Sequence, residues 1–296
     1  MKKLEDMNLV DDFLAYSLTA HKVYGEEASR YILQCILQRE IRHLTVVPQK
    51  TWYGERPEAH GVRLDIYLDE EDGEIFDMEP DNNDSESDVA ALPRRVRFYH
   101  AKIDAGNLVA GDDYSALRNV VVIFITTYDP FGRNRMVYTV KNGCVEEPDL
   151  PYEDGAKTIF LYTKGTEGRP SKELLLLAQY MEHSTIENAR TAGLERLHEM
   201  VLEVKSDREV GMAYMKAYEF EKHIREKAIK EGMEEGIKEG IEEGIKKGIE
   251  EGIQIFILDN LEEKVPEERI LEKLQRHYHL TREKAKEYYD RFAGEA

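Results

Sequence analysis

Cysteine is scarce in this chain of 296 residues, which contains only Cys35 and Cys144. Neither belongs to a C-x-x-C pair, so a disulfide framework and a cysteine-based zinc site are both disfavoured. No stretch reaches the roughly 18 consecutive apolar residues of a membrane-spanning helix. No apolar run follows a basic start at the N-terminus, so we expect no signal peptide, no membrane association and a cytoplasmic location.

Positive charge is also in short supply. The chain has 41 lysines and arginines against 60 acidic residues, a net charge of -19. This balance argues against a basic protein that coats nucleic acid. It leaves room for an enzyme that meets DNA through a local basic patch, and Arg94, Arg95, Arg97 and Lys102 form such an island. The Walker, G-x-G-x-x-G, G-x-S-x-G and H-E-x-x-H motifs are all absent.

Two segments with alternating polarity carry the strongest signal. Residues 62–68 (VRLDIYL) and 76–79 (FDME) flank an acidic, glycine-containing connection, DEEDG. Period-two alternation around a short turn predicts a β-hairpin. Folded about Asp72, this hairpin has one apolar side, on which Leu64 faces Pro80, Ile66 faces Met78 and Leu68 faces Phe76. Its other side pairs Tyr67 with Asp77, Asp65 with Glu79 and Arg63 with Asp81.

The pairing of Asp65 with Glu79 is the informative one, because like charges directly opposed across a sheet are destabilising. A divalent cation between the two carboxylates would remove the repulsion. Period two also places Asp77 and Asp81 on the same face as Glu79. The alternative interpretation is a solvated strand face whose acids serve solubility.

The rest of the chain predicts an α/β fold, a mixed sheet flanked by helices in the order α-β-β-β-α-β and followed by a helical C-terminal extension. Residues 120–125 (VVVIFI) are apolar throughout and predict a central strand buried on both faces. Between the hairpin and residue 89 we expect a polar loop. The other predicted elements are helices within the first 40 residues, at 92–103 and from 171 to 181, and strands at 44–47, 136–140 and 158–162.

A four-residue repeat of glycine, an aliphatic residue and two charges runs from Gly232 to Ile253. Each glycine costs a helix about 1 kcal/mol relative to alanine, so this helix is marginal by itself. Two interpretations fit: a flexible, partly helical linker, or a homo-oligomerisation segment that is firmly helical when paired. We expect a domain at 1–225, the repeat segment at 226–255 and a small helical unit at 256–296.

The string HGVRLDIYLDEEDGEIFDMEPD, followed by LPRRVRFYHAKIDAGNL, GDDYSALRNVVVIFIT and YDPFG, resembles the recombination-promoting nuclease and transposase family of the PD-(D/E)XK nuclease superfamily. The resemblance covers residues 9–181. It implies a restriction-endonuclease-like α-β-β-β-α-β core. It also implies that Asp65 and Glu79 bind a divalent cation, Mg²⁺ or Mn²⁺, which activates water against a DNA phosphodiester.

The third polar position of the family pattern, usually Lys or Gln, falls on Asp81, which is a departure. Three interpretations fit: Asp81 is a third metal ligand, its role has moved to Lys102, Arg95 or Arg97, or the enzyme is impaired. Lys102 also fits an ordinary solvated helix position. The resemblance suggests supporting roles for Gln49, for Arg63, which could instead simply pair with Asp81, and for an acid on the first helix, Glu26 or Glu27.

From these residues we expect a metal-dependent DNA endonuclease in which Asp65, Glu79, Asp81 and Lys102 serve catalysis. Arg94, Arg95 and Arg97 would contact the DNA backbone. The alternative is a catalytically degenerate nuclease fold that acts as a DNA-binding or self-associating module. A third interpretation is a scaffold protein whose function lies in the glycine-repeat tail.

Overall fold

The structure is a computed structural model that describes residues 2–48, 51–52, 62–63, 66–69 and 73–294. The chain divides into two compact units, Met1–Tyr218 and Glu219–Ala296. In the described residues, no helix combines the length and the apolar character needed to cross a bilayer.

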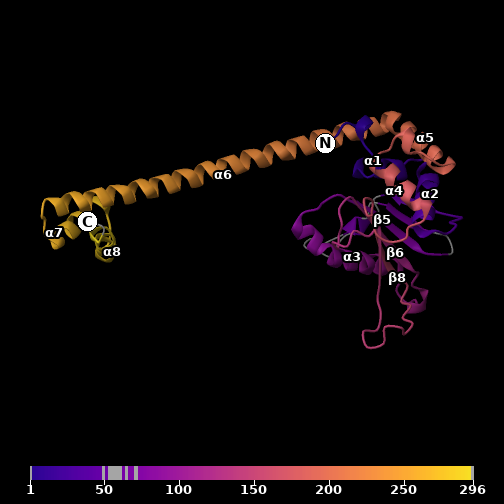
Figure 1. Ribbon diagram of the computed structural model, residues 1–296, viewed down its shortest axis with the longest axis horizontal. Helices are drawn as coiled ribbons and strands as arrows, with labels where there is room; N and C mark the ends of the chain where they lie inside the picture. The colour runs from indigo at the N-terminus through magenta and orange to yellow at the C-terminus, as the bar shows by residue number, and fades with distance from the viewer. Residues whose placement is uncertain (1, 49–50, 53–61, 64–65, 70–72, 295–296) are drawn as a thin grey trace. The chain divides into compact units, whose positions relative to one another are not determined.

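Unit 1 is built on a mixed sheet (Figure 1). Its six strands, among the described residues, lie in the order β1-β4-β5-β6-β8-β7. The neighbours β5, β6 and β8 run parallel, while the other pairs are antiparallel. A separate two-stranded sheet joins β2 and β3. The strands are β1 (Thr45–Pro48), β2 (Thr51–Trp52), β3 (Val62–Arg63), β4 (Ile66–Asp69), β5 (Ile75–Asp81), β6 (Val120–Thr126), β7 (Val137–Lys141) and β8 (Ala156–Tyr162).

The described part of the hairpin has the predicted register. Ile66 pairs with Met78, Tyr67 with Asp77 and Leu68 with Phe76. Arg63 was expected opposite Asp81, but its backbone pairs with Thr51 in the two-stranded sheet instead. Pro80 is the next-to-last residue of β5, which is an interior strand of the sheet.

The two faces of the sheet are covered by different helices (Figure 1). One face packs Leu68, Phe76 and Met78 into the main core with α1, α2, α4 and α5. The other packs Tyr67, Ile75 and Phe124 against α3. The helices of unit 1 are α1 (Asp12–Thr19), α2 (Gly25–Leu37), α3 (Glu86–Asn107), α4 (Lys172–Glu182) and α5 (Ala192–Ser206), with single 3₁₀ turns at Leu4–Asp6, Tyr114–Ala116 and Ile186–Asn188. This confirms the predicted α/β fold.

Helix α3 is longer than predicted and shortens the polar loop expected up to residue 89. It begins at Glu86 because Ser85 caps it, accepting a hydrogen bond from the backbone of Asp88. Such a cap satisfies an N–H group that the first turn leaves without a helical partner. Pro93 lies inside the helix without ending it. As the crossover between parallel β5 and β6, α3 carries its residues across the acidic face of β5.

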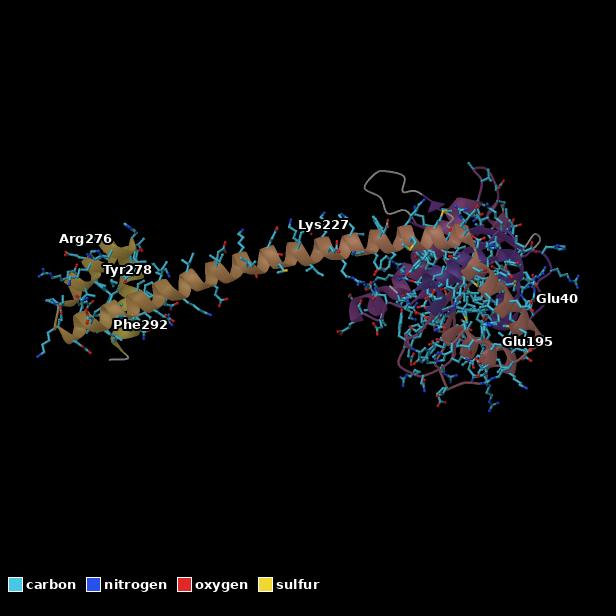
Figure 2. The ribbon with its side chains drawn as sticks, turned by 90° about the horizontal axis from the view of Figure 1, so that it is seen from above. Glu40, Glu195, Lys227, Arg276, Tyr278 and Phe292 are labelled. Carbon is cyan, nitrogen blue, oxygen red and sulfur yellow. The ribbon has the colours of Figure 1, made fainter. Side chains whose placement is uncertain are left out.

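Unit 2 has its own small core. It contains part of α6 (Arg208–Glu262), within which the boundary between the units falls, and helices α7 (Glu267–Tyr278) and α8 (Arg282–Ala293). The hydroxyl of Tyr278 donates a hydrogen bond to the carbonyl of Gly252 at 3.0 Å, and Phe292 is buried in the core (Figure 2). The glycine repeat lies within α6 and is helical, although its six glycines lower the helix propensity.

Two histidines of unit 1 predict a pH-dependent stability. Burial lowers the pKa of His198, which Lys205 lowers further, and burial also lowers the pKa of His100. Because the folded pKa lies below the unfolded value, the unfolded state binds more protons as pH falls through about 6.5. The free energy of unfolding should therefore decrease between about pH 7.5 and 5.5. Urea denaturation at both values measures this, and His198→Gln should flatten the dependence. Equal midpoints at both pH values would contradict it.

Candidate active site

Strand β5 brings three carboxylates to one face of the sheet. Asp77, Glu79 and Asp81 are 0%, 4% and 6% exposed. They alternate with the apolar residues that point into the main core, so all three lie on the face that α3 covers. An interior strand leaves little solvent around its side chains, and a buried carboxylate is costly unless charges or hydrogen bonds compensate it.

Arg95 of α3 compensates Asp81. Its guanidinium donates to Asp81 Oδ2 at 2.6 Å and lies 4.8 Å from the centre of the Phe124 ring. Burial alone would lower the pKa of Arg95, but the charges of Asp81 and Glu79 contribute to a net increase. Arg95 is therefore a permanently charged cation beside the acids, more than two helical turns after the Ser85 cap.

Tyr128, which follows the end of β6, completes this side of the site. Burial raises the pKa of its hydroxyl, and the adjacent charge of Asp81 and a hydrogen bond with it raise that pKa further. The phenol therefore stays protonated and can donate a hydrogen bond to the carboxylate. Asp81 is thus held from two sides, which fixes its orientation.

The start of α1 contributes a further acid. The amide nitrogen of Asn82 donates to Asp12 Oδ1 at 2.8 Å and to the carbonyl of Val10 at 2.7 Å. The amide oxygen of Asn82 accepts from Thr127 Oγ1 at 2.9 Å. This one side chain ties together α1, the end of β5 and the end of β6.

These groups line an open pocket of about 600 Å³ at the carboxyl end of β5. Ligands of α/β proteins commonly bind at this end of parallel strands. The lining is acidic, with one arginine among three carboxylates. Its residues are Asp12, Glu79, Pro80, Asp81, Asn82, Asn83, Arg95 and Tyr99.

The chemistry of this lining suits a hard divalent cation, because carboxylate and amide oxygens are the ligands that Mg²⁺ prefers. Glu79 and Asp81 are the described carboxylates of β5 that reach the pocket. Outside the gaps in the described chain, no group of three or more acidic, histidine or cysteine side chains is arranged to hold a metal. Asp65, the acid predicted to share a cation with Glu79, lies in one of these gaps.

The predicted site residues divide into three groups. Asp65 and Gln49 lie outside the described residues, as does the side chain of Arg63. The structure brings Glu79, Asp81 and Arg95 together. The other residues lie outside this pocket. Arg94 and Arg97 are exposed on α3, and the ammonium of Lys102 lies 5.6 Å from the centre of the Phe98 ring. The carboxylate of Glu27 accepts two hydrogen bonds, at 2.9 and 3.0 Å, from the guanidinium of Arg196 in α5.

The sequence pointed to Glu26 and Glu27 as acids from the first helical region, whereas the acid that lines the pocket is Asp12. Asn82 and Tyr128 were not predicted either. Asn82 stands directly after the strand that carries Glu79 and Asp81, and this position at a strand's carboxyl end was a usable signal. Nothing local distinguishes Asp12 from its neighbour Asp11, because its role depends on how α1 docks on the sheet.

Comparison with known proteins bears on this site. Residues 20–147 match a family model described as PD-(D/E)XK nuclease family transposase. The matched segment contains Asp65, Glu79, Asp81 and Arg95, while Asp12 lies before it. This confirms the resemblance drawn from the sequence. No curated protein and no solved structure matches the chain.

Proposed function

We propose, from the match of residues 20–147 to the PD-(D/E)XK nuclease family transposase, that this chain is a metal-dependent DNA endonuclease. Nucleases of this superfamily generally use divalent metals. The observation that carries the proposal is the cluster of Glu79, Asp81 and Arg95 in one pocket at the carboxyl end of β5. Buried carboxylates beside a fixed guanidinium provide both a cation site and a positive group for a phosphate.

In this proposal Asp65 and Glu79 hold the cation, which is Mg²⁺ or Mn²⁺. When bound, such an ion polarises a phosphodiester and lowers the pKa of a coordinated water. Arg95 supplies the positive charge that the family pattern places at position 81, since its guanidinium lies within 2.6 Å of that carboxylate. The exposed Arg94 and Arg97 contact the DNA backbone, and Lys102 extends this basic surface of α3.

The alternative is a catalytically degenerate fold that binds DNA or itself. Asp81 favours it, because an acid replaces the usual Lys or Gln and its ion pair with Arg95 offsets the guanidinium charge. The scaffold interpretation places the function in the tail instead. Both differ from the endonuclease in what they predict for cleavage.

Plasmid nicking separates these functions. Wild-type protein should nick supercoiled DNA in the presence of Mg²⁺ or Mn²⁺ and not in the presence of a chelator, whereas Asp65→Ala should not nick. Equal nicking by both proteins would indicate a contaminating nuclease. DNA binding without nicking by the wild type would favour the degenerate module, and neither binding nor nicking would favour the scaffold.

Self-association through α6 is a second, compatible role. Met233, Ile237, Ile241 and Ile245 are 57–63% exposed, although side chains of this size and polarity are usually buried. A Cβ added at any glycine from Gly232 to Gly248 would meet open space. A row of isoleucines beside such glycines would let another helix pack closely.

The charges along the repeat favour an antiparallel second copy. Glu242 and Glu243 precede Gly244, and Lys246 and Lys247 follow it. Parallel helices in register would place like charges at the same level. Antiparallel helices that cross at Gly244 place the acidic pair of each copy beside the basic pair of the other.

The paired substitution Ile241→Glu and Ile245→Glu should therefore lower the oligomeric mass of the full chain to that of a monomer. Desolvating the two carboxylates between helices would cost more than the apolar contact provides. Light scattering measures the mass. As a matched control, Glu219→Gln with Glu226→Gln, two exposed positions of α6 before the repeat, should leave self-association in place. A wild type that is already monomeric, or an unchanged mass in the isoleucine variant, would contradict the proposal.

A further inference from the structure

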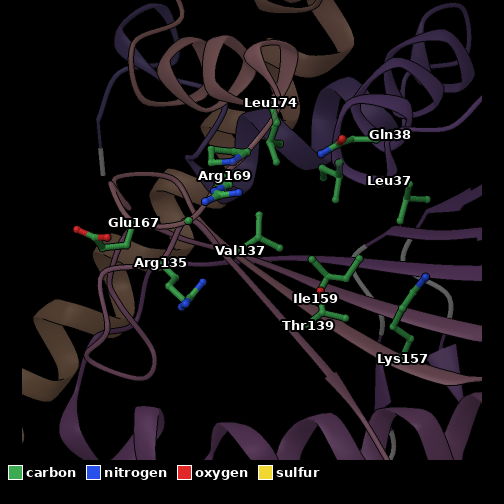
Figure 3. Close-up of a pocket in the computed structure, with 13 residues that line it drawn as sticks. Leu37, Gln38, Arg135, Val137, Thr139, Lys157, Ile159, Glu167, Arg169 and Leu174 are labelled. Atoms are coloured by element: carbon green, nitrogen blue, oxygen red, sulfur yellow. The ribbon is translucent and has the colours of Figure 1, made fainter. Parts of the chain in front are cut away.

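A second pocket lies on the opposite face of the sheet from α3, away from the candidate active site. It has a volume of about 390 Å³ and lies between the end of α2, the edge strand β7 with its neighbour β8, and the segment before α4 (Figure 3). Its lining shares no residue with the acidic pocket. Pockets of about 300–1,000 Å³ are typical of sites for small organic ligands.

The floor of this pocket is apolar. Leu37 from α2, Val137 from β7, Ile159 from β8 and Leu174 from α4 line it (Figure 3). Two neutral polar side chains, Gln38 and Thr139, are placed among them.

Three cations surround this floor: Arg135, Lys157 and Arg169. Within the described part of the chain, no carboxylate lies within 4.0 Å of any of the three, the distance that defines an ion pair. The one acidic residue of the lining is Glu167, whose carboxylate points away from Val137 and Ile159 (Figure 3). In a chain with a net charge of -19, this pocket is therefore a local concentration of positive charge.

The charges and shape together point to the ligand. Arginine forks and a lysine ammonium are the side chains that recognise phosphate oxygens. A bare phosphate would leave the apolar floor unused, and a long polyanion would not need an enclosed pocket. The amide of Gln38 can both donate and accept, as the polar edge of a nucleobase requires.

We infer that this pocket binds a nucleoside monophosphate, with the phosphate held by Arg135 and Arg169 at one end and the base and sugar over the apolar floor towards Lys157 at the other end (Figure 3). The site is separate from the proposed nuclease pocket and would exist even if that pocket had no catalytic activity. Its ligand is a mononucleotide rather than a nucleic-acid chain.

Isothermal titration of the full chain tests this with AMP, GMP, CMP and dTMP, alongside adenosine, inorganic phosphate and a single-stranded oligonucleotide. At least one monophosphate should bind saturably, and more tightly than adenosine or phosphate alone. Arg135→Met and Arg169→Met should each weaken binding by about tenfold or more, the effect of losing one charge-assisted hydrogen bond. Arg133→Met is the matched control, because Arg133 is exposed nearby but does not line the pocket, and its affinity should match the wild type.

A third variant guards against effects on folding. Thr139→Trp on the exposed edge strand fills the pocket from the rim and should abolish binding while leaving the urea midpoint unchanged. The inference is overturned if no monophosphate binds, if adenosine or phosphate binds as tightly as the monophosphate, or if only the oligonucleotide binds. Equal affinities of wild type, Arg135→Met and Arg169→Met would overturn it as well.

Discussion

Replacing Glu79 by glutamine should reduce plasmid nicking by at least about a hundredfold, since a metal ligand contributes more than the outer-shell groups whose loss costs 10- to 100-fold. Glutamine keeps the size and one oxygen of the side chain but removes the negative charge that a cation needs. Glu79 is only 4% exposed, so this near-isosteric change is preferable to alanine, which would leave a cavity. Nicking rates with saturating Mg²⁺ measure the effect.

Asp84→Asn is the matched control for Glu79→Gln. Asp84 follows β5 in the same acidic segment, but it is exposed and does not line the pocket. This variant should nick at the wild-type rate. Full activity in Glu79→Gln, measured on protein purified in parallel, would remove Glu79 from catalysis.

Replacing Arg95 by methionine should affect both stability and activity. Asp81 is 6% exposed and would lose its charged partner at 2.6 Å. Breaking a fully buried ion pair costs about 3–5 kcal/mol; because Arg95 is 35% exposed, we expect about 2–3 kcal/mol. Urea denaturation measures this change in the free energy of unfolding. Nicking should fall as well, because the pocket loses its cation for the phosphate.

A double variant separates the two effects of Arg95. Asp81→Asn combined with Arg95→Met removes both charges, so most of the stability should return while activity stays low. Arg133→Met controls for the loss of one positive charge, because Arg133 is exposed, does not line the pocket and lies outside the basic surface of α3. Wild-type nicking by the stable double variant would show that Arg95 serves only the structure.

The parts of the fold that local patterns specify could be predicted from the sequence. The apolar run at 120–125 is fully buried in β6, and the register of Ile66 with Met78 follows from alternation and turn position. A slip of one residue would turn every apolar side chain of β4 to the wrong face. Such constraints act within a few residues and are therefore visible in the sequence.

The partners of the acidic side chains could not be predicted in the same way. The sequence offered three basic residues, Arg95, Arg97 and Lys102, that could supply the positive charge missing at Asp81. Which of them reaches Asp81 depends on where α3 begins. The Ser85 cap starts the helix earlier than its apolar pattern suggested. Asp12 reaches the pocket only because Asn82 ties α1 to the end of β5, a contact between residues 70 positions apart.

Binding of Mn²⁺ is the most direct test of the central proposal, that Asp65 and Glu79 share one cation. Titration of the full chain followed by electron paramagnetic resonance counts bound Mn²⁺ without relying on cleavage. The wild type should show a site that is lost in both Asp65→Asn and Glu79→Gln, while Asp84→Asn retains it. Undiminished Mn²⁺ binding in the two site variants would contradict the proposal.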